Sequence, residues 1–187
     1  YVLIEASRSG LPWLAAASIL AAFALAAFLS QVAITESLQL QASLVAAVLR
    51  ASAVFLVAVH VVTSVVRENA DKAFELVLSL PVSRVEFYLG KLAGHAAAGA
   101  AIATVFALPL LVWAAPGAAF AWWASLVLET LLIAALSLFF VFTLANVVPA
   151  LSAIAGFYLL SRSIASLQAI AVGPLAEDGF VARVARW

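Results

Sequence analysis

The stretch Arg67–Gly94, with the sequence RENADKAFELVLSLPVSRVEFYLGKLAG, differs sharply in composition from the rest of the chain. It holds four of the nine basic residues and four of the nine acidic residues. The segments on either side of it are long and almost uncharged. A charged insert between apolar segments is typical of a loop that connects two membrane spans outside the bilayer. This stretch therefore sets the expected topology of the whole chain.

The apolar composition assigns the chain to the integral membrane proteins. Of its 187 residues, 67% are hydrophobic and 10% are charged, and the mean hydropathy is +1.22. Soluble domains are about 45–50% apolar and about 25% charged. No window alternates strictly between apolar and polar residues, as the strands of a membrane barrel would. We therefore predict an all-α polytopic membrane protein.

The composition also excludes several kinds of function. A net charge of zero gives no indication of nucleic-acid binding. The chain has no cysteine, which excludes disulfides, iron–sulfur clusters and thiolate metal sites. It also has no methionine, so we expect Tyr1 not to be the natural start and the chain to be a fragment of a longer polypeptide.

Five segments are apolar enough and long enough to cross the hydrocarbon core, which takes about 20 helical residues. We predict one transmembrane domain over residues 1–187, with the end of an interfacial helix at residues 1–10 and an outward-facing interfacial segment at 173–187. The five predicted spans cover residues 11–30, 44–66, 92–113, 122–145 and 150–172.

The distribution of lysine and arginine sets the predicted orientation. The loops expected at residues 31–43 and 114–121 contain neither residue, whereas the loop at 67–91 contains four of them. Short loops rich in lysine and arginine stay on the cytoplasmic side. The N-terminus and the charged insert are therefore predicted to be cytoplasmic.

Within the insert, residues 69–81 are predicted to form a short amphipathic helix that ends at Pro81, because the residue before a proline avoids the helical conformation. The pattern S-x-x-E at Ser83–Glu86 is a capping box, which predicts the start of the next helix. Gly90 and Gly94 form a small-xxx-small pattern, which predicts the close approach of another helix. A solvated loop without a partner is the alternative.

The insert carries the string FELVLSLPVSR over residues 74–84, followed by Gly90-Lys91. In its position after the second predicted span, this string resembles the loop after the second helix of ABC-2-type transporter permeases. In that family the loop is the coupling helix, which inserts into a groove of the nucleotide-binding subunit. The resemblance implies that the docking residues are Phe74, Glu75, Leu78, Leu80, Pro81 and Arg84.

The resemblance also implies a fold and a function. The fold would be a type V exporter-like ABC-2 transmembrane domain, of which five helices out of six are visible. The chain is expected to be the permease subunit of an ATP-driven exporter in the bacterial inner (cytoplasmic) membrane, multi-pass, with a cytoplasmic N-terminus. Its expected partners are two copies of a cytoplasmic ABC ATPase, a second permease protomer, identical or homologous, and the lipid bilayer, but no nucleic acid.

ATP and magnesium are expected in the partner subunit, and no cofactor is expected in this chain. The sequence lacks G-x-x-x-x-G-K-[ST], because Gly90-Lys91 has neither the preceding glycine nor the following hydroxyl. It also lacks Ser-His-Asp, paired-carboxylate and H-E-x-x-H arrangements, so we predict no catalytic residues and no enzyme activity. The alternatives are a membrane scaffold or assembly subunit, and a secondary transporter or channel without ATPase coupling.

Three charged residues, Arg50, Glu129 and Arg162, fall inside predicted spans, where each charge costs about 2.5–3.5 kcal/mol on insertion scales. They could form a polar translocation lining, or an Arg–Glu pair could tie two helices together. Arg50 and Glu129 could instead snorkel, because each lies close to the end of a predicted span. Arg162 lies in mid-span and is the best candidate for an interior role.

His60 and His95 also fall inside predicted spans. Without cysteine, methionine or neighbouring carboxylates, two isolated histidines make a poor metal site. We therefore predict interhelical hydrogen bonds for them and no metal site.

Overall fold

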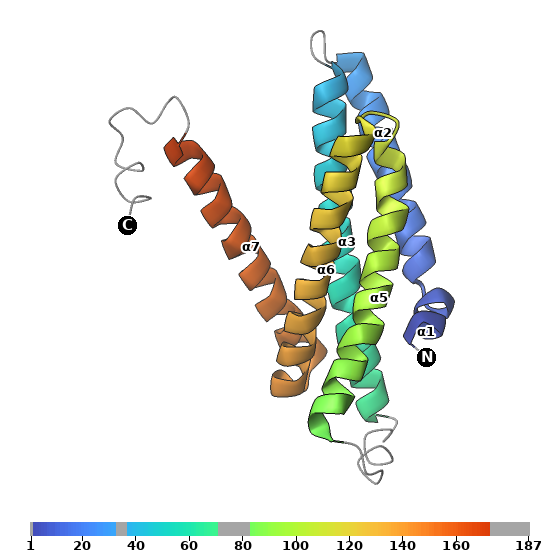
Figure 1. The fold of residues 1–187 in the computed structure, drawn as a ribbon, viewed down its shortest axis with the longest axis vertical. Coiled ribbons are helices and arrows are strands. Elements are labelled where there is room, and N and C mark those ends of the chain that lie inside the picture. The colour runs from blue at the N-terminus through green and yellow to red at the C-terminus, as the bar shows by residue number, and fades with distance from the viewer. Residues whose placement is uncertain (1, 33–36, 71–82, 173–187) are drawn as a thin grey trace.

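The computed structural model of the protein describes residues 2–32, 37–70 and 83–172 (Figure 1). Every regular element in these residues is a helix, and no strand occurs among them. The helices are α1 (Val2–Arg8), α2 (Leu11–Val32), α3 (Ser37–Ala70), α5 (Arg84–Leu110), α6 (Pro116–Leu144) and α7 (Val147–Val172).

Five of these helices, α2, α3, α5, α6 and α7, are long and apolar enough to cross a membrane. The prediction of an all-α chain with five candidate spans is therefore confirmed for the described residues. Helices α2, α3, α5 and α6 lie side by side, while α7 meets the bundle near its start and then diverges from it (Figure 1). Helix α1 is short and packs against α5 and α2.

Helix α3 forms the centre of the bundle. It contacts α2, α5, α6 and α7, and a larger share of it is buried than of any other candidate span. Its inward-facing side chains, such as Leu49 and Val61, pack with Phe106 of α5 and Leu138 of α6 in one apolar core. Small residues in this core let the helices pack closely, which drives helix association where lipid is as apolar as the side chains.

The helix bounds differ from the predicted spans at several places. The second span was predicted to end at residue 66, but α3 continues to Ala70. The predicted loop at 31–43 is wrong, because α2 continues to Val32 and α3 already begins at Ser37. The predicted turn at 114–121 is also wrong, because Pro116 occupies the first turn of α6, where its missing N–H costs nothing. In both predicted loops, the polar residues and the proline were interpreted as parts of a loop. A helix tolerates such residues in its first turns.

The turn predicted at 146–149 is likewise shorter than expected. Ala145 adopts a left-handed conformation, with a φ of 55°, and α7 begins at Val147. Pro149 therefore lies in the first turn of α7 and needs no hydrogen bond for its nitrogen. The chain reverses direction here within very few residues, which places the start of α7 against the end of α6.

The predicted capping box at the start of α5 is present. The Glu86 backbone N–H donates to Ser83 Oγ at 3.2 Å, and the Ser83 backbone N–H donates to Glu86 Oε2 at 3.0 Å. Each of these bonds satisfies a backbone donor that a helix start would otherwise leave without an acceptor. The capping box fixes the point at which the chain leaves the insert and enters α5.

We expect Ser83→Ala to weaken the first turn of α5 by about 1 kcal/mol, because an alanine at this position cannot accept the Glu86 backbone hydrogen. Amide hydrogen exchange at residues 84–87 should become faster, while exchange deeper in α5 is unchanged. Ser18→Ala is the matched control, because its hydroxyl bonds only the Leu14 carbonyl inside α2. Unchanged exchange at residues 84–87 would show that the capping box does not hold this helix start.

Candidate functional site

An ion pair between Arg50 of α3 and Glu129 of α6 lies inside the candidate spans. Arg50 Nη1 is 2.5 Å from Glu129 Oε2, and the two side chains are only 17% and 18% exposed. Arg50 Nη2 also donates to Ser125 Oγ at 2.7 Å. Ser125 and Glu129 are four residues apart and therefore share one face of α6. The guanidinium thus has two partners on the same helix: Glu129 neutralises its charge, and Ser125 accepts a hydrogen bond from it.

The pair lies deeper in α3 than the predicted span suggested. Arg50 is about 20 Å along α3 from its first residue, Ser37, at 1.5 Å per residue. The Arg50 side chain lies over the Trp122 ring, with its Cζ 5.4 Å from the ring centre, which adds a cation–π contact. The sequence left three alternatives for Arg50 and Glu129: a polar lining, an ion pair between helices, and snorkelling. In the structure the two side chains form the ion pair.

A cleft of about 410 Å³ lies beside this pair, between α3 and α7. It is lined mainly by apolar side chains, among them Val54 and Phe55 of α3 and Ile154 and Leu159 of α7. Tyr158 also lines it and interacts electrostatically with Glu129. The cleft is therefore apolar along its walls and polar where it meets the ion pair.

Arg162, the third predicted intramembrane charge, follows Tyr158 by one turn of α7. Its side chain is exposed and interacts electrostatically with Tyr158. The structure thus brings Arg50 and Glu129 together, whereas Arg162 lies exposed on α7, one turn beyond Tyr158 of the cleft. Ser125, Trp122 and Tyr158, which complete the polar group, were not predicted.

A second group of polar side chains lies where α1, α3 and α5 meet, and we call it the polar seam. Lys91 of α5 pairs with Glu68 of α3, and Ser64 Oγ donates to the Glu5 carboxylate at 3.0 and 3.1 Å. Further along the seam, the rings of His60 and His95 are 5.5 Å apart. The members of the polar seam are Glu5, His60, Ser64, Glu68, Lys91 and His95.

The polar seam was not predicted, although its spacing was visible in the sequence. His60, Ser64 and Glu68 recur every four residues, as do Lys91 and His95, so each set shares one face of its helix. Glu5 was expected at the membrane surface, with its polar face in the headgroups. Instead, its carboxylate turns inward to Ser64, because this contact satisfies a charge beside the bundle.

The two glycines of the predicted packing motif behave differently. A Cβ at Gly94 would lie 2.9 Å from Val2 Cγ2, so α1 approaches α5 closely at this point. A Cβ at Gly90 would meet no atom of the described chain within 4 Å. Another glycine of α5, Gly99, does approach a membrane span closely, because a Cβ there would lie 3.0 Å from Thr130 Cβ of α6. Gly99 was not singled out, although Gly99 and Ala103 also form a small-xxx-small pattern.

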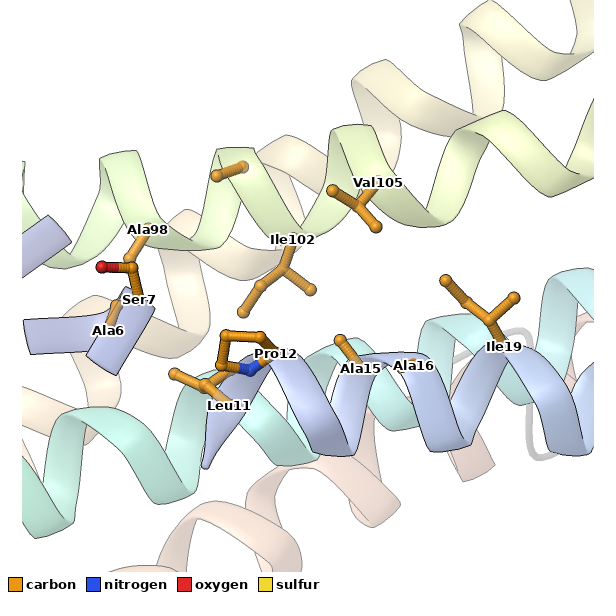
Figure 2. Close-up of a pocket in the computed structure, with 11 residues that line it drawn as sticks. Ala6, Ser7, Leu11, Pro12, Ala15, Ala16, Ile19, Ala98, Ile102 and Val105 are labelled. Carbon is orange, nitrogen blue, oxygen red and sulfur yellow. The ribbon is translucent and has the colours of Figure 1, made fainter. Parts of the chain in front are cut away.

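An apolar cavity of about 340 Å³ lies between α2 and α5, next to α1 (Figure 2). Ile19 of α2 and Ile102 and Val105 of α5 point toward it, and Ser7 supplies the polar atom labelled at its rim. No charged side chain lines this cavity. Its chemistry suits hydrocarbon, and it lies apart from the Arg50–Glu129 pair.

Most of the predicted docking residues lie outside the described residues, namely Phe74, Glu75, Leu78, Leu80 and Pro81. The same holds for the interfacial segment predicted at 173–187. Arg84 is the first residue of α5 and is exposed. The end of α3, the start of α5 and helix α1 lie at the same end of the bundle (Figure 1), as the predicted topology requires.

Comparison of the chain with models of protein families, with curated proteins and with solved structures gives no match. The class that the fold and the polar groups define is an all-helical, multi-pass membrane protein. Among the described residues, no group of three or more His, Asp or Glu side chains is arranged to hold a metal ion.

Proposed function

We propose that this chain is the membrane-spanning permease subunit of an ATP-driven ABC-2-type exporter. The observation that carries the proposal is the string FELVLSLPVSR at residues 74–84 with Gly90-Lys91 after it, in the connection between α3 and α5. The five apolar helices support it, because the insert follows the second of them and precedes the third. The fold would be the type V exporter-like ABC-2 transmembrane domain.

In this proposal the insert receives the force of ATP binding from the partner ATPase. Helix α3 ends at Ala70 and α5 begins at Arg84, and each is one continuous helix through the bundle. The Glu68–Lys91 ion pair joins their ends, so a push on the insert moves both helices together. Glu5 and Val2 fasten α1 to the same pair of helices. In this proposal, the polar seam therefore holds α1, α3 and α5 together next to the insert.

We expect this movement of α3 to act on the Arg50–Glu129 pair and on the cleft between α3 and α7. Tilting α3 against α6 and α7 changes the width of the cleft, because α7 contacts the bundle only near its start. Two ATPase subunits, carrying ATP and magnesium, and a second permease protomer complete the proposed transporter. Its place is the bacterial inner membrane, with the N-terminus and the insert in the cytoplasm.

The helices do not favour the secondary-transporter alternative. Such transporters bind their substrate near the mid-membrane, typically where spans are broken into half-helices. Each candidate span in the described part of the chain is a continuous helix. The scaffold alternative needs no ATPase, so the same experiment tests it against the proposal.

The deciding experiment is purification of the full-length protein from its native membrane, followed by detection of a bound ATPase. We expect an ATPase to co-purify with the wild type and to be reduced at least about tenfold with Glu75→Arg/Pro81→Ala, because charge reversal at a docking surface leaves a partner charge unpaired. Gly117→Ser is the matched control, because a side chain at this exposed position meets no neighbouring atom.

Two results would contradict the proposal. One is the absence of any ATPase from the wild-type preparation, which would favour the scaffold function. The other is equal ATPase recovery from the double variant and the wild type, which would show that residues 74–84 do not dock the ATPase. Size-exclusion profiles of both proteins establish that the variant is folded.

A further inference from the structure

The chain contains only two histidines and no cysteine, and the fold places both histidines side by side. His60 comes from α3 and His95 from α5, and their rings meet edge to face with an interplanar angle of 72°. They belong to the polar seam but take no part in its ion pair. This pairing of the only imidazoles in the chain needs a physical reason.

Both histidines are buried, and three of their ring nitrogens lack a hydrogen-bond partner within the described chain, so the interhelical hydrogen bonds predicted for these nitrogens are not present. His60 is 7% exposed and His95 is 1% exposed. The unpartnered atoms are His60 Nε2 and both ring nitrogens of His95. Buried polar atoms almost always have a hydrogen-bond partner, because an unpaired buried polar atom destabilises the protein. Inside a membrane, no bulk water is present to supply the missing hydrogen bond. A ligand that bonds imidazole nitrogen would remove this cost.

The distance between the two rings fits a shared metal ion. Two imidazoles on one tetrahedral Zn²⁺ have ring centres roughly 5–6 Å apart when each Zn–N bond is about 2.0–2.1 Å. The observed separation is 5.5 Å. Neutral imidazole is also the ligand that Zn²⁺ and other late transition metals prefer, whereas Mg²⁺ prefers oxygen.

The charges around the histidines also suit a cation. The Glu5 carboxylate interacts electrostatically with His60 and is held by Ser64, one helical turn from His60. Lys91 interacts with His95, but Glu68 pairs with this lysine and offsets its charge. Within the polar seam, two carboxylates therefore face one ammonium group, which leaves one negative charge available for a bound cation.

We propose that His60 and His95 bind a divalent transition-metal ion between α3 and α5, with Glu5 supplying one negative charge that offsets part of the charge of the ion. Water completes the coordination, since the described residues place no third histidine or carboxylate within the ligand set. A bound ion would join α3 to α5 next to the Glu68–Lys91 pair. The proposal does not depend on ATPase coupling, and its test needs no ATPase.

The test is a titration of the purified full-length protein with Zn²⁺ by calorimetry, with an affinity tag that contains no histidine. We expect one Zn²⁺ per chain for the wild type, and at least about a 100-fold loss of affinity for His60→Gln and for His95→Gln, since even residues behind the ligands are worth 10–100-fold. Zn²⁺ should also raise the unfolding temperature of the wild type and not of these variants.

Two controls define the site. Glu86→Gln removes an exposed carboxylate at the start of α5 and should leave Zn²⁺ binding unchanged. Glu5→Gln should lower the affinity about tenfold, as expected for a group behind the ligands. Mg²⁺, which prefers oxygen ligands, should give no heat in any of these proteins.

The wild type provides a test that does not rely on variants. Bound Co²⁺ should show the visible absorption of a low-coordinate site with nitrogen ligands, and Zn²⁺ should displace it. Absence of stoichiometric Zn²⁺ binding by the wild type would overturn the proposal. Equal binding by the His60→Gln/His95→Gln double variant would overturn it as well.

Discussion

Replacing either Arg50 or Glu129 alone is expected to destabilise the bundle by about 3 kcal/mol, the lower end of the cost of breaking a buried ion pair, because both side chains are only partly buried. Arg50→Met would strand the Glu129 carboxylate between α3 and α6. Glu129→Leu would strand the Arg50 guanidinium, which would keep only its contacts with Ser125 and Trp122. The effect should be visible as a lower unfolding temperature in detergent and a lower yield from the membrane.

The double variant Arg50→Met/Glu129→Leu removes both charges and leaves no unpaired charge. Its free energy of unfolding therefore shows how much the ion pair contributes to stability. We expect it to be within about 1 kcal/mol of the wild type, because apolar residues of similar size often replace a buried ion pair without loss. The four proteins form a double-mutant cycle, whose coupling term measures the interaction. Additive effects of the two substitutions would contradict the pairing.

Arg8→Met is a suitable control for the removal of a positive charge. Arg8 lies in the last turn of α1 and is exposed. Its replacement should change stability little, since exposed charges typically contribute no more than about 1 kcal/mol. A loss of stability as large as that of Arg50→Met would show that charge itself, and not its burial, is responsible.

Gly99→Leu is expected to destabilise the protein by about 1–3 kcal/mol or more, the usual effect of overfilling a packed core. A Cβ at position 99 would lie 3.0 Å from Thr130 Cβ and 3.1 Å from Thr130 Oγ1, and the side chain of Val57 closes the same space. Thr130 is fully buried and Val57 is 2% exposed, so neither can turn aside into lipid. Helices α5 and α6 would have to separate.

Gly156→Leu is the matched control for this substitution. Gly156 also lies inside a candidate span, in α7, but a Cβ there would meet no atom within 4 Å. Both substitutions remove a helical glycine and add the same side chain, so propensity and hydrophobicity cancel in the comparison. Equal unfolding temperatures for the two variants would show that α5 and α6 do not approach closely at Gly99.

The sequence by itself determined which segments of this chain are helices. The length and hydrophobicity of the apolar runs fixed the number and order of the spans, because a helix must satisfy its own backbone in lipid. The Ser83–Glu86 capping box fixed the start of α5, since its hydrogen bonds join neighbours in the chain. Both features depend on residues only a few positions apart.

The ends of the spans were predicted less well, for a related reason. Residues 37–43 are polar enough to be interpreted as a loop, yet they form the first turns of α3. A helix that extends past the hydrocarbon core can carry polar residues, and α3 is about 51 Å long at 1.5 Å per residue. Polarity marks where the membrane ends and not where the helix ends.

Only the tertiary structure decided which side chains meet. That Arg50 pairs with Glu129, that Glu5 turns inward to Ser64 and that His60 lies against His95 all depend on how each helix is rotated about its axis. The same rotation makes Gly99 a contact between spans and leaves Gly90 open. Rotation is set by the packing of neighbouring helices. The four-residue spacing of His60, Ser64 and Glu68 indicates that they share one face of α3, but not which helix that face meets. The polar contacts between the helices therefore become visible only when the bundle is assembled.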